Sequence, residues 1–145
     1  MNVVVDTNII FSAILSSKGK IGNLLLNSVN RFEFFTTSYL LEELDTHHDK
    51  LKKISGINDS DIKYLKRILF NHIEFIDPNL IHPDNWQNAY NLVKDIDEND
   101  TPFVALSLEI QAYLWTGDKK LNRALKQKGV NWILTTNELM EIRNK

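Results

Sequence analysis

The chain has 145 residues, a formal net charge of −2 and a pI of about 6.1, so its overall charge predicts no attraction to nucleic acid. Apolar residues make up 43% and charged residues 25%, which excludes a disordered or fibrous class and suits one domain over residues 1–145. No cysteine and no long apolar run occur, so we expect no disulfides or thiolate metal site, no membrane contact and a cytoplasmic location.

The first predicted element is a short strand at Val3 to Val5, whose unbroken β-branched residues are typical of a strand buried on both faces. It runs directly into Asp6. Apolar residues at helical spacing over 9–14 predict a helix immediately afterwards, with Thr7 or Asn8 as its N-cap. A second helix is expected from Ile21 after the break at "SSKGKIG".

The middle of the chain predicts two further strands. "RFEFFTTS" indicates a strand that leads into a helix over 39–44, with Thr37 or Ser38 as its cap. The polar segment 47–53 predicts no element of its own, and an amphipathic helix follows over 62–69. "HIEFID" indicates the third strand, which Pro78 ends.

The last third of the chain repeats the same alternation of helix and strand. One helix face is predicted at Trp86, Ala89, Tyr90 and Val93, and Thr101 is expected to cap the next helix with Pro102 at its first position. "AYLW" and "NWILT" indicate strands four and five, with a helix containing Leu121 and Leu125 between them. Thr135 and Glu138 have the spacing of a capping box for the final helix.

This alternation predicts an α/β fold: a three-layer α/β/α sandwich around a central five-stranded parallel sheet. In such sheets, ligand sites form at the carboxyl ends of the strands. Asp6 follows strand one, Asp118 follows strand four, Asp100 precedes the helix before strand four, and Glu42 or Glu43 lies one turn into the helix after strand two.

Each of these acids has two interpretations. At a helix N-terminus, an acid stabilises unpaired amides and the helix dipole by about 0.3–1 kcal/mol, and helix capping is common. Clustered carboxylates also repel one another unless a hard cation such as Mg²⁺ or Mn²⁺ joins them, and oxygen ligands are the kind these ions prefer. Neutral caps beside the acids favour the cation site, which could bind and activate a phosphodiester.

Four segments in this order resemble the PIN-domain family, the metal-dependent ribonucleases that include VapC-type toxins. They are "VVVDTNIIFSAIL", "TSYLLEEL", "DENDTPFVALSLE" and "LWTGDKKL". The resemblance covers nearly the whole chain and implies a sheet order of 3-2-1-4-5. It implies that the catalytic and metal-binding residues are Asp6, Glu43, Asp100 and Asp118, with Glu42 as the alternative to Glu43, and that supporting roles fall to Thr7, Asn8, Asp97 and Thr116.

The resemblance also implies function and partners. The expected activity is Mg²⁺- or Mn²⁺-dependent hydrolysis of RNA as an endoribonuclease, leaving 5′-phosphate and 3′-hydroxyl ends. The expected partners are an RNA substrate, an antitoxin protein if the chain is the toxin of a toxin–antitoxin pair, and a second copy in a homodimer.

Several alternatives stay open. The run with Lys119, Lys120 and Arg123 is either a nucleic-acid contact or a solvated helix face. A PIN-like module that binds RNA or protein without cutting is the main rival to the nuclease. Asn8 stands where a haloacid-dehalogenase-like phosphatase needs a second acid, which disfavours that class. The histidines lack metal-type spacing, and the three tryptophans are expected in the core.

Overall fold

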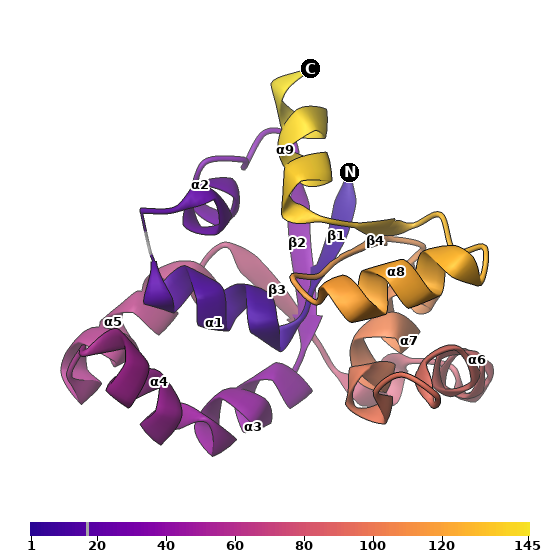
Figure 1. The fold of residues 1–145 in the computed structure, drawn as a ribbon, viewed down its shortest axis with the longest axis horizontal. Coiled ribbons are helices and arrows are strands. Elements are labelled where there is room, and N and C mark those ends of the chain that lie inside the picture. Colours follow the sequence, from indigo (N-terminus) through magenta and orange to yellow (C-terminus); the bar gives the residue numbers. More distant parts are fainter. Residues whose placement is uncertain (17) are drawn as a thin grey trace.

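The centre of the molecule is a five-stranded, all-parallel sheet, in a computed structural model that describes residues 1–16 and 18–145 (Figure 1). The strands are β1 (Asn2–Val5), β2 (Glu33–Thr37), β3 (Ile73–Ile76), β4 (Tyr113–Trp115) and β5 (Ile133–Leu134). Their order is β3-β2-β1-β4-β5. The α/β fold and the sheet order predicted from the sequence are therefore confirmed, and β1 is the middle strand.

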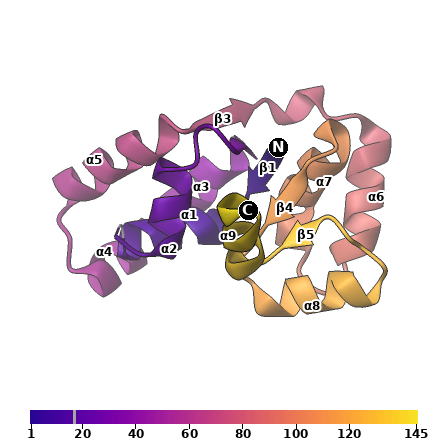
Figure 2. The ribbon, with the colours of Figure 1, turned by 90° about the horizontal axis from the view of Figure 1, so that it is seen from above.

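Helices cover both faces of this sheet (Figure 2). One group packs around α1 and consists of α1 (Thr7–Leu15), α2 (Lys20–Leu26), α3 (Tyr39–Thr46), α4 (His48–Ser55) and α5 (Asp59–Phe70), with α9 (Thr136–Asn144) against α2. The other group consists of α6 (Pro83–Val93), α7 (Thr101–Ile110) and α8 (Lys119–Gln127). Two short 3-10 turns, η1 (Pro78–Leu80) and η2 (Glu98–Asp100), flank α6.

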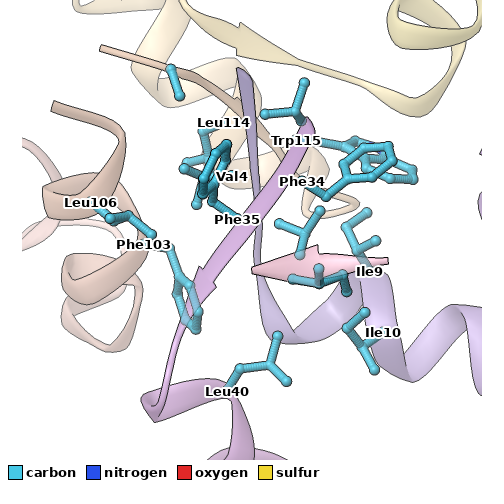
Figure 3. Packing of buried hydrophobic residues seen from close by; sticks show 14 of the residues in the cluster. Val4, Ile9, Ile10, Phe34, Phe35, Leu40, Phe103, Leu106, Leu114 and Trp115 are labelled. Atoms are coloured by element: carbon cyan, nitrogen blue, oxygen red, sulfur yellow. The ribbon is translucent and has the colours of Figure 1, made fainter. Parts of the chain in front are cut away.

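The core holds β1 firmly between the two helical layers. Val3, Val4 and Val5 have no exposed surface, as expected for a strand covered on both sides. Figure 3 shows Ile9 of α1 on one side of the sheet and Phe103 of α7 on the other. Residues at the carboxyl end of β1 are consequently fixed in position by the packing behind them.

Two expectations about the helices were wrong. The segment 47–53, for which no element was predicted, belongs largely to α4, because Leu51 alone anchors that short helix by complete burial. On α6 the predicted apolar face is only partly buried: Ala89 and Val93 have no exposed surface, but Trp86 is half-buried and Tyr90 is 41% exposed. Because α6 packs mainly against α7, it covers the core with only part of its apolar face.

Within the part of the chain that the structure describes, no single helix is long and apolar enough to cross a membrane. Among the described residues, α1 and α2 taken together, bent by 110° between them, are the one pair that meets such a criterion by length and composition. Their apolar residues, such as Ile9, Ile10 and Leu24, are buried in the core.

Candidate acidic site at the carboxyl edge of the sheet

The fold brings the sequence-predicted acids to one edge of the sheet. β1 and β4 are paired, with Val5 opposite Trp115, so Asp6 and the loop carrying Asp118 leave the sheet side by side. Glu43, just beyond the first turn of α3, and Asp100, the residue before α7, lie close enough to this edge for their charges to act on one another. Their negative charges act on one another: those of Asp6, Asp118 and Glu43 all raise the pKa of Asp100.

Asp6 is the most enclosed of these acids, with 3% of its surface exposed. Its Oδ1 atom accepts a hydrogen bond from the Ile9 amide at 3.2 Å, so Asp6 itself is the N-cap of α1, and the expectation of Thr7 or Asn8 in that role was wrong. Its Oδ2 atom is buried without a hydrogen-bond partner. Burial raises the pKa of Asp6 to about 7, against the opposing effects of Thr116 and the Ile9 amide.

Thr7 connects the first acid to the second. Its hydroxyl donates a hydrogen bond to Oε1 of Glu43 at 3.0 Å. Glu43 is half-buried and faces the cluster, whereas Glu42 is exposed, so the geometry favours Glu43 for the role that the sequence left between them. Burial raises the pKa of Glu43, while the hydrogen bond from Thr7 lowers it. Asn8 is exposed.

Asp100 ends the 3-10 turn η2 and occupies the N-cap position of α7, where its side chain makes no capping hydrogen bond. Thr101, the expected cap, is the first residue of that helix, and its hydroxyl donates to the Glu98 carbonyl at 2.6 Å. The Oδ2 atom of Asp100 is buried and unpaired. Burial first, and then the charges of Asp6 and Asp97, raise the pKa of Asp100 to about 8.

Asp118 caps the helix α8. Its Oδ1 atom accepts hydrogen bonds from the amides of Lys120 at 2.9 Å and Leu121 at 3.1 Å. The buried Thr116 accepts a hydrogen bond from the Asp118 amide at 3.1 Å and so fixes the turn before the helix. Asp97, the expected supporting acid, is exposed and caps η2 through the Asn99 amide.

Three of the four acids, Asp6, Glu43 and Asp118, share one arrangement: the fold uses one carboxylate oxygen and leaves the other without a hydrogen bond to the described residues. The oxygen that the fold uses is Oδ1 in Asp6 and Asp118, where it caps a helix. In Glu43 it is Oε1, which accepts a hydrogen bond from Thr7. Capping and ligand binding are therefore compatible at the same residue. An asparagine could make the same caps, but its second polar atom would be an amide nitrogen, which donates instead of accepting.

A protein-family model described as "PIN domain" matches residues 4–141. The chain belongs to the PIN-domain family. It is 31% identical over 123 residues to an uncharacterized protein of Acanthamoeba polyphaga mimivirus, which covers 77% of this chain and 52% of that protein. The chain thus spans about half the length of this curated relative. PIN domains are generally metal-dependent nucleases.

Solved structures share the fold. VapBC2 from Rickettsia felis, in a crystal structure with a DNA fragment from their promoter, is 19% identical and superimposes with a TM-score of 0.68 over 93% of this chain and 97% of that chain. A PilT N-terminus domain protein of the hyperthermophilic archaeon Sulfolobus solfataricus P2 is 18% identical, with a TM-score of 0.56 over 99% and 93%. At these identities the likeness shows the PIN fold and nothing more.

The acids of this PIN domain fit a hard divalent cation by their chemistry. The donor set consists of oxygen alone, and two buried carboxylate oxygens, on Asp6 and Asp100, have no partner within the protein. Among residues 1–16 and 18–145, however, no three carboxylate or histidine side chains stand close enough together to form a ready-made metal centre. The predicted four-carboxylate metal site therefore stays a prediction.

A basic surface on α8 flanks the acids of the PIN domain. On α8, the predicted nucleic-acid contacts Lys119, Lys120 and Arg123 are exposed next to Asp118. Later in the same run, Lys126 and Lys128 are instead engaged in ion pairs with Glu138 and Asp95.

Beside Glu43 lies a groove of about 580 Å³ whose walls include Tyr39, Trp86 and Tyr90. Tyr39 and Trp86 pack edge to face, with ring centroids 6.1 Å apart. Of the three tryptophans expected in the core, only Trp115 is fully buried, while Trp86 and Trp132 are half-buried. Helical periodicity suggested a core role for Trp86 and gave no sign of this groove.

Proposed function

We propose that this PIN domain is an endoribonuclease that hydrolyses RNA with Mg²⁺ or Mn²⁺ bound by Asp6, Glu43, Asp100 and Asp118. The observation that carries the proposal is the pair of buried, unpartnered carboxylate oxygens on Asp6 and Asp100 at the carboxyl edge of the sheet. A fold that keeps such atoms without a donor loses stability through their desolvation, and a bound cation offsets that loss.

The residues of the chain have separate tasks in this proposal. When bound, the divalent ions neutralise the acids, lower the pKa of a coordinated water and stabilise the leaving oxygen. Asp6 and Asp118 are held in place by the helices that they cap. Thr7 orients the Glu43 carboxylate and favours its ionised form. The exposed Asp97 adds negative charge that acts on Glu43 and Asp100.

The test compares wild type with Asp6→Asn and Asp118→Asn on mixed RNA in Mg²⁺, Mn²⁺ or EDTA. Each substitution keeps the cap oxygen and removes the second one, so we expect folded proteins whose cleavage falls on the order of 100-fold or more. Asp61→Asn, at an exposed acid in the first turn of α5, is the matched control and keeps full activity. Ligation of the products reports whether they carry 5′-phosphate ends.

A wild type that is inert in both metals, or variants that cut as well as wild type, would exclude the nuclease. The second candidate is a PIN module that binds RNA or protein without cutting, and the lack of a ready-made metal centre in the described residues favours it. RNA binding that is unchanged by EDTA, together with no cleavage, is the result expected for that module.

We further propose that the chain is the toxin of a toxin–antitoxin pair. Its structural likeness to VapBC2 supports an antitoxin partner and a homodimer. Induced expression in a bacterial host should then arrest growth in an Asp6-dependent manner, and the protein encoded beside it should relieve the arrest. Light scattering of the purified chain gives its molecular mass in solution and so reports whether it is a dimer. Unimpeded growth under expression of a protein that cuts RNA in vitro would contradict the toxin assignment.

A further inference from the structure

A pocket of about 230 Å³ lies where α8 and α9 begin, next to Asp118. Its walls include Lys119 and Asn122 from α8, and Thr136 and Asn137 from α9. The ion pair between Lys126 and Glu138 joins the two helices farther along. Two helix N-termini therefore face one small, partly enclosed space beside the acidic site.

Several hydrogen-bond donors line this space. The backbone amides of Thr136 and Asn137 stand at the start of α9, where helical bonding leaves amides without acceptors, and Thr135 already caps the next amide, that of Glu138. The Thr136 hydroxyl accepts a hydrogen bond from Trp115 Nε1 at 3.0 Å, which leaves its own proton available for donation. Lys119 adds a positive charge.

Asn122 provides independent evidence that a ligand belongs here. The residue is only 7% exposed, and its amide nitrogen is buried without a hydrogen-bond partner. Buried amide groups are nearly always paired, so an unpaired donor in the wall of a pocket indicates an acceptor that binds there. Leucine would fill the same position on α8 without an unpaired polar group.

The charge around the pocket defines the class of ligand. Asp118 is the only acid among its lining residues, and its Oδ1 atom already faces two amides. By contrast, the groove beside Glu43 is lined by Glu42, Glu43 and Glu98 and by no lysine or arginine. An anionic group that only accepts hydrogen bonds suits the pocket between α8 and α9, and helix N-termini favour such a group.

We propose that this pocket binds a phosphate group of the nucleic-acid strand, adjacent to the phosphodiester that faces the acids. The inference rests on the proposed nuclease function. It gives the path of the strand across the surface, which leads from Asp118 toward the start of α9. Lys119 and the α9 amides hold the phosphate, and Asn122 donates to one of its oxygens.

The first experiment titrates inorganic phosphate into the full chain in EDTA, with chloride at equal ionic strength as the reference. We expect saturable NMR shifts at the amides of Lys119, Thr136 and Asn137 and at the Asn122 side chain. Asn122→Asp replaces the donor with a carboxylate and should abolish these shifts. Asn30→Asp introduces the same charge at an exposed position and should leave them intact. Shifts that do not saturate, or that appear equally at the N-terminus of α5, would overturn the pocket.

The second experiment connects the pocket to the strand and uses an exposed residue whose replacement leaves the core intact. Anisotropy of a short single-stranded RNA in EDTA at low salt should show binding weakened about fivefold by Lys119→Gln, because one phosphate contact is lost. Lys63→Gln removes the same charge from the exposed side of α5 and should change binding less than twofold. Equal effects of the two variants would overturn the strand assignment and leave a site for free phosphate.

The two proposals fail separately. A wild type that cuts no RNA but shows saturable phosphate-dependent shifts at Thr136 and Asn137 and the Lys119 effect on RNA binding overturns the nuclease and supports the phosphate pocket. A wild type that cuts RNA, with no phosphate-dependent shifts at Thr136 and Asn137, supports the nuclease and overturns the pocket.

Discussion

At the scale of single residues, the central feature is a set of carboxylates whose environment disfavours their charge. Burial raises the pKa of Asp6 to about 7 and that of Asp100 to about 8. The pKa of Asp95, an acid on the surface, shifts in the opposite direction: its hydrogen-bonded ion pair with Lys128 lowers it. Since strongly perturbed acids in a cleft are typical of functional sites, this contrast agrees with the proposed role.

Asp100→Asn should stabilise the metal-free protein at pH 8. The folded state holds the Asp100 proton more tightly than the unfolded chain, so the stability from this group is complete below about pH 4 and is lost as the pH rises toward 8. Asparagine does not titrate and removes that loss. Thermal unfolding in EDTA should show a Tm higher than wild type by about 3 °C or more at pH 8, with the difference shrinking toward pH 4.

Asp95→Asn is the control of opposite sign. The pKa of Asp95 is lower in the folded protein than in the unfolded chain, so this acid stabilises the fold at pH values above its unfolded pKa. The substitution should therefore lower Tm slightly at pH 8 and change it little near pH 3. If both variants changed Tm alike at pH 8, the buried environment of Asp100 would not be the cause.

Thr7→Val tests a positioning residue. Valine has the shape of threonine but lacks the hydroxyl that donates to Glu43, so the pKa of Glu43 should rise further. We expect cleavage to fall about tenfold near pH 7 and to recover partly at higher pH, as the acid side of the pH–rate profile moves upward. Thr46→Val removes a hydroxyl that bonds only to the Glu42 carbonyl on the same helix and should leave the profile unchanged.

At the scale of elements, sequence patterns predicted which helices and strands exist better than where each begins. All five strands and the Thr135–Glu138 capping box were predicted correctly. The cap of α7 was placed one residue late and that of α1 one or two residues late, because residues able to cap stand next to each other and spacing alone cannot choose between them. Tertiary contacts decided: the Thr7 hydroxyl is directed at Glu43, and Asp6 accepts the hydrogen bond from the Ile9 amide.

The helix ends also give a stability prediction. Gln111 ends α7 with a positive φ of 52°, a conformation that costs most non-glycine residues about 1 kcal/mol. Gln111→Gly should therefore raise the free energy of unfolding by about 0.5 kcal/mol in urea titrations, because the flexibility of glycine in the unfolded chain offsets part of the gain.

Gly56 provides the reverse comparison. It ends α4 with a φ of 70°, and a Cβ atom added there would meet nothing within 4 Å. Gly56→Ala should therefore lower the free energy of unfolding by about 1 kcal/mol through backbone conformation alone. If both substitutions changed stability in the same direction, backbone conformation would not explain either.

At the scale of the whole molecule, the parallel sheet determines where the acids meet. The edge at which the acids lie followed from the sequence, since residues after neighbouring parallel strands share an edge. The family resemblance pointed to Glu43 with Glu42 as the alternative, and the hydrogen bond from Thr7 to Glu43 adds a structural reason for that choice. The pocket at Asn122 gave no sequence signal, since nothing in the order of residues shows that a buried amide is unpaired.

Metal binding should stabilise the molecule as a whole, and more strongly as the pH rises. A cation displaces the protons held by Asp6 and Asp100, whose pKa values are about 7 and 8, so its apparent affinity should increase from pH 6 to pH 8. Differential scanning with millimolar Mn²⁺ should show a Tm increase that is larger at pH 8 than at pH 6 and absent in Asp6→Asn. A Tm increase that does not depend on pH would mean that the ion binds at a site without Asp6 and Asp100.

In Asp6 and Asp118, one carboxylate oxygen caps a helix and the other does not, and this has a consequence for the evolution of such chains. One oxygen of Asp6 or Asp118 caps a helix, and an asparagine, reached from aspartate by a single-base change, keeps that oxygen. Loss of chemistry and loss of architecture are therefore separate events. A lineage could silence this domain in one step and retain its shape as a surface for partners. Sequences with asparagine at these positions would then keep the fold without the carboxylates that the proposed nuclease needs.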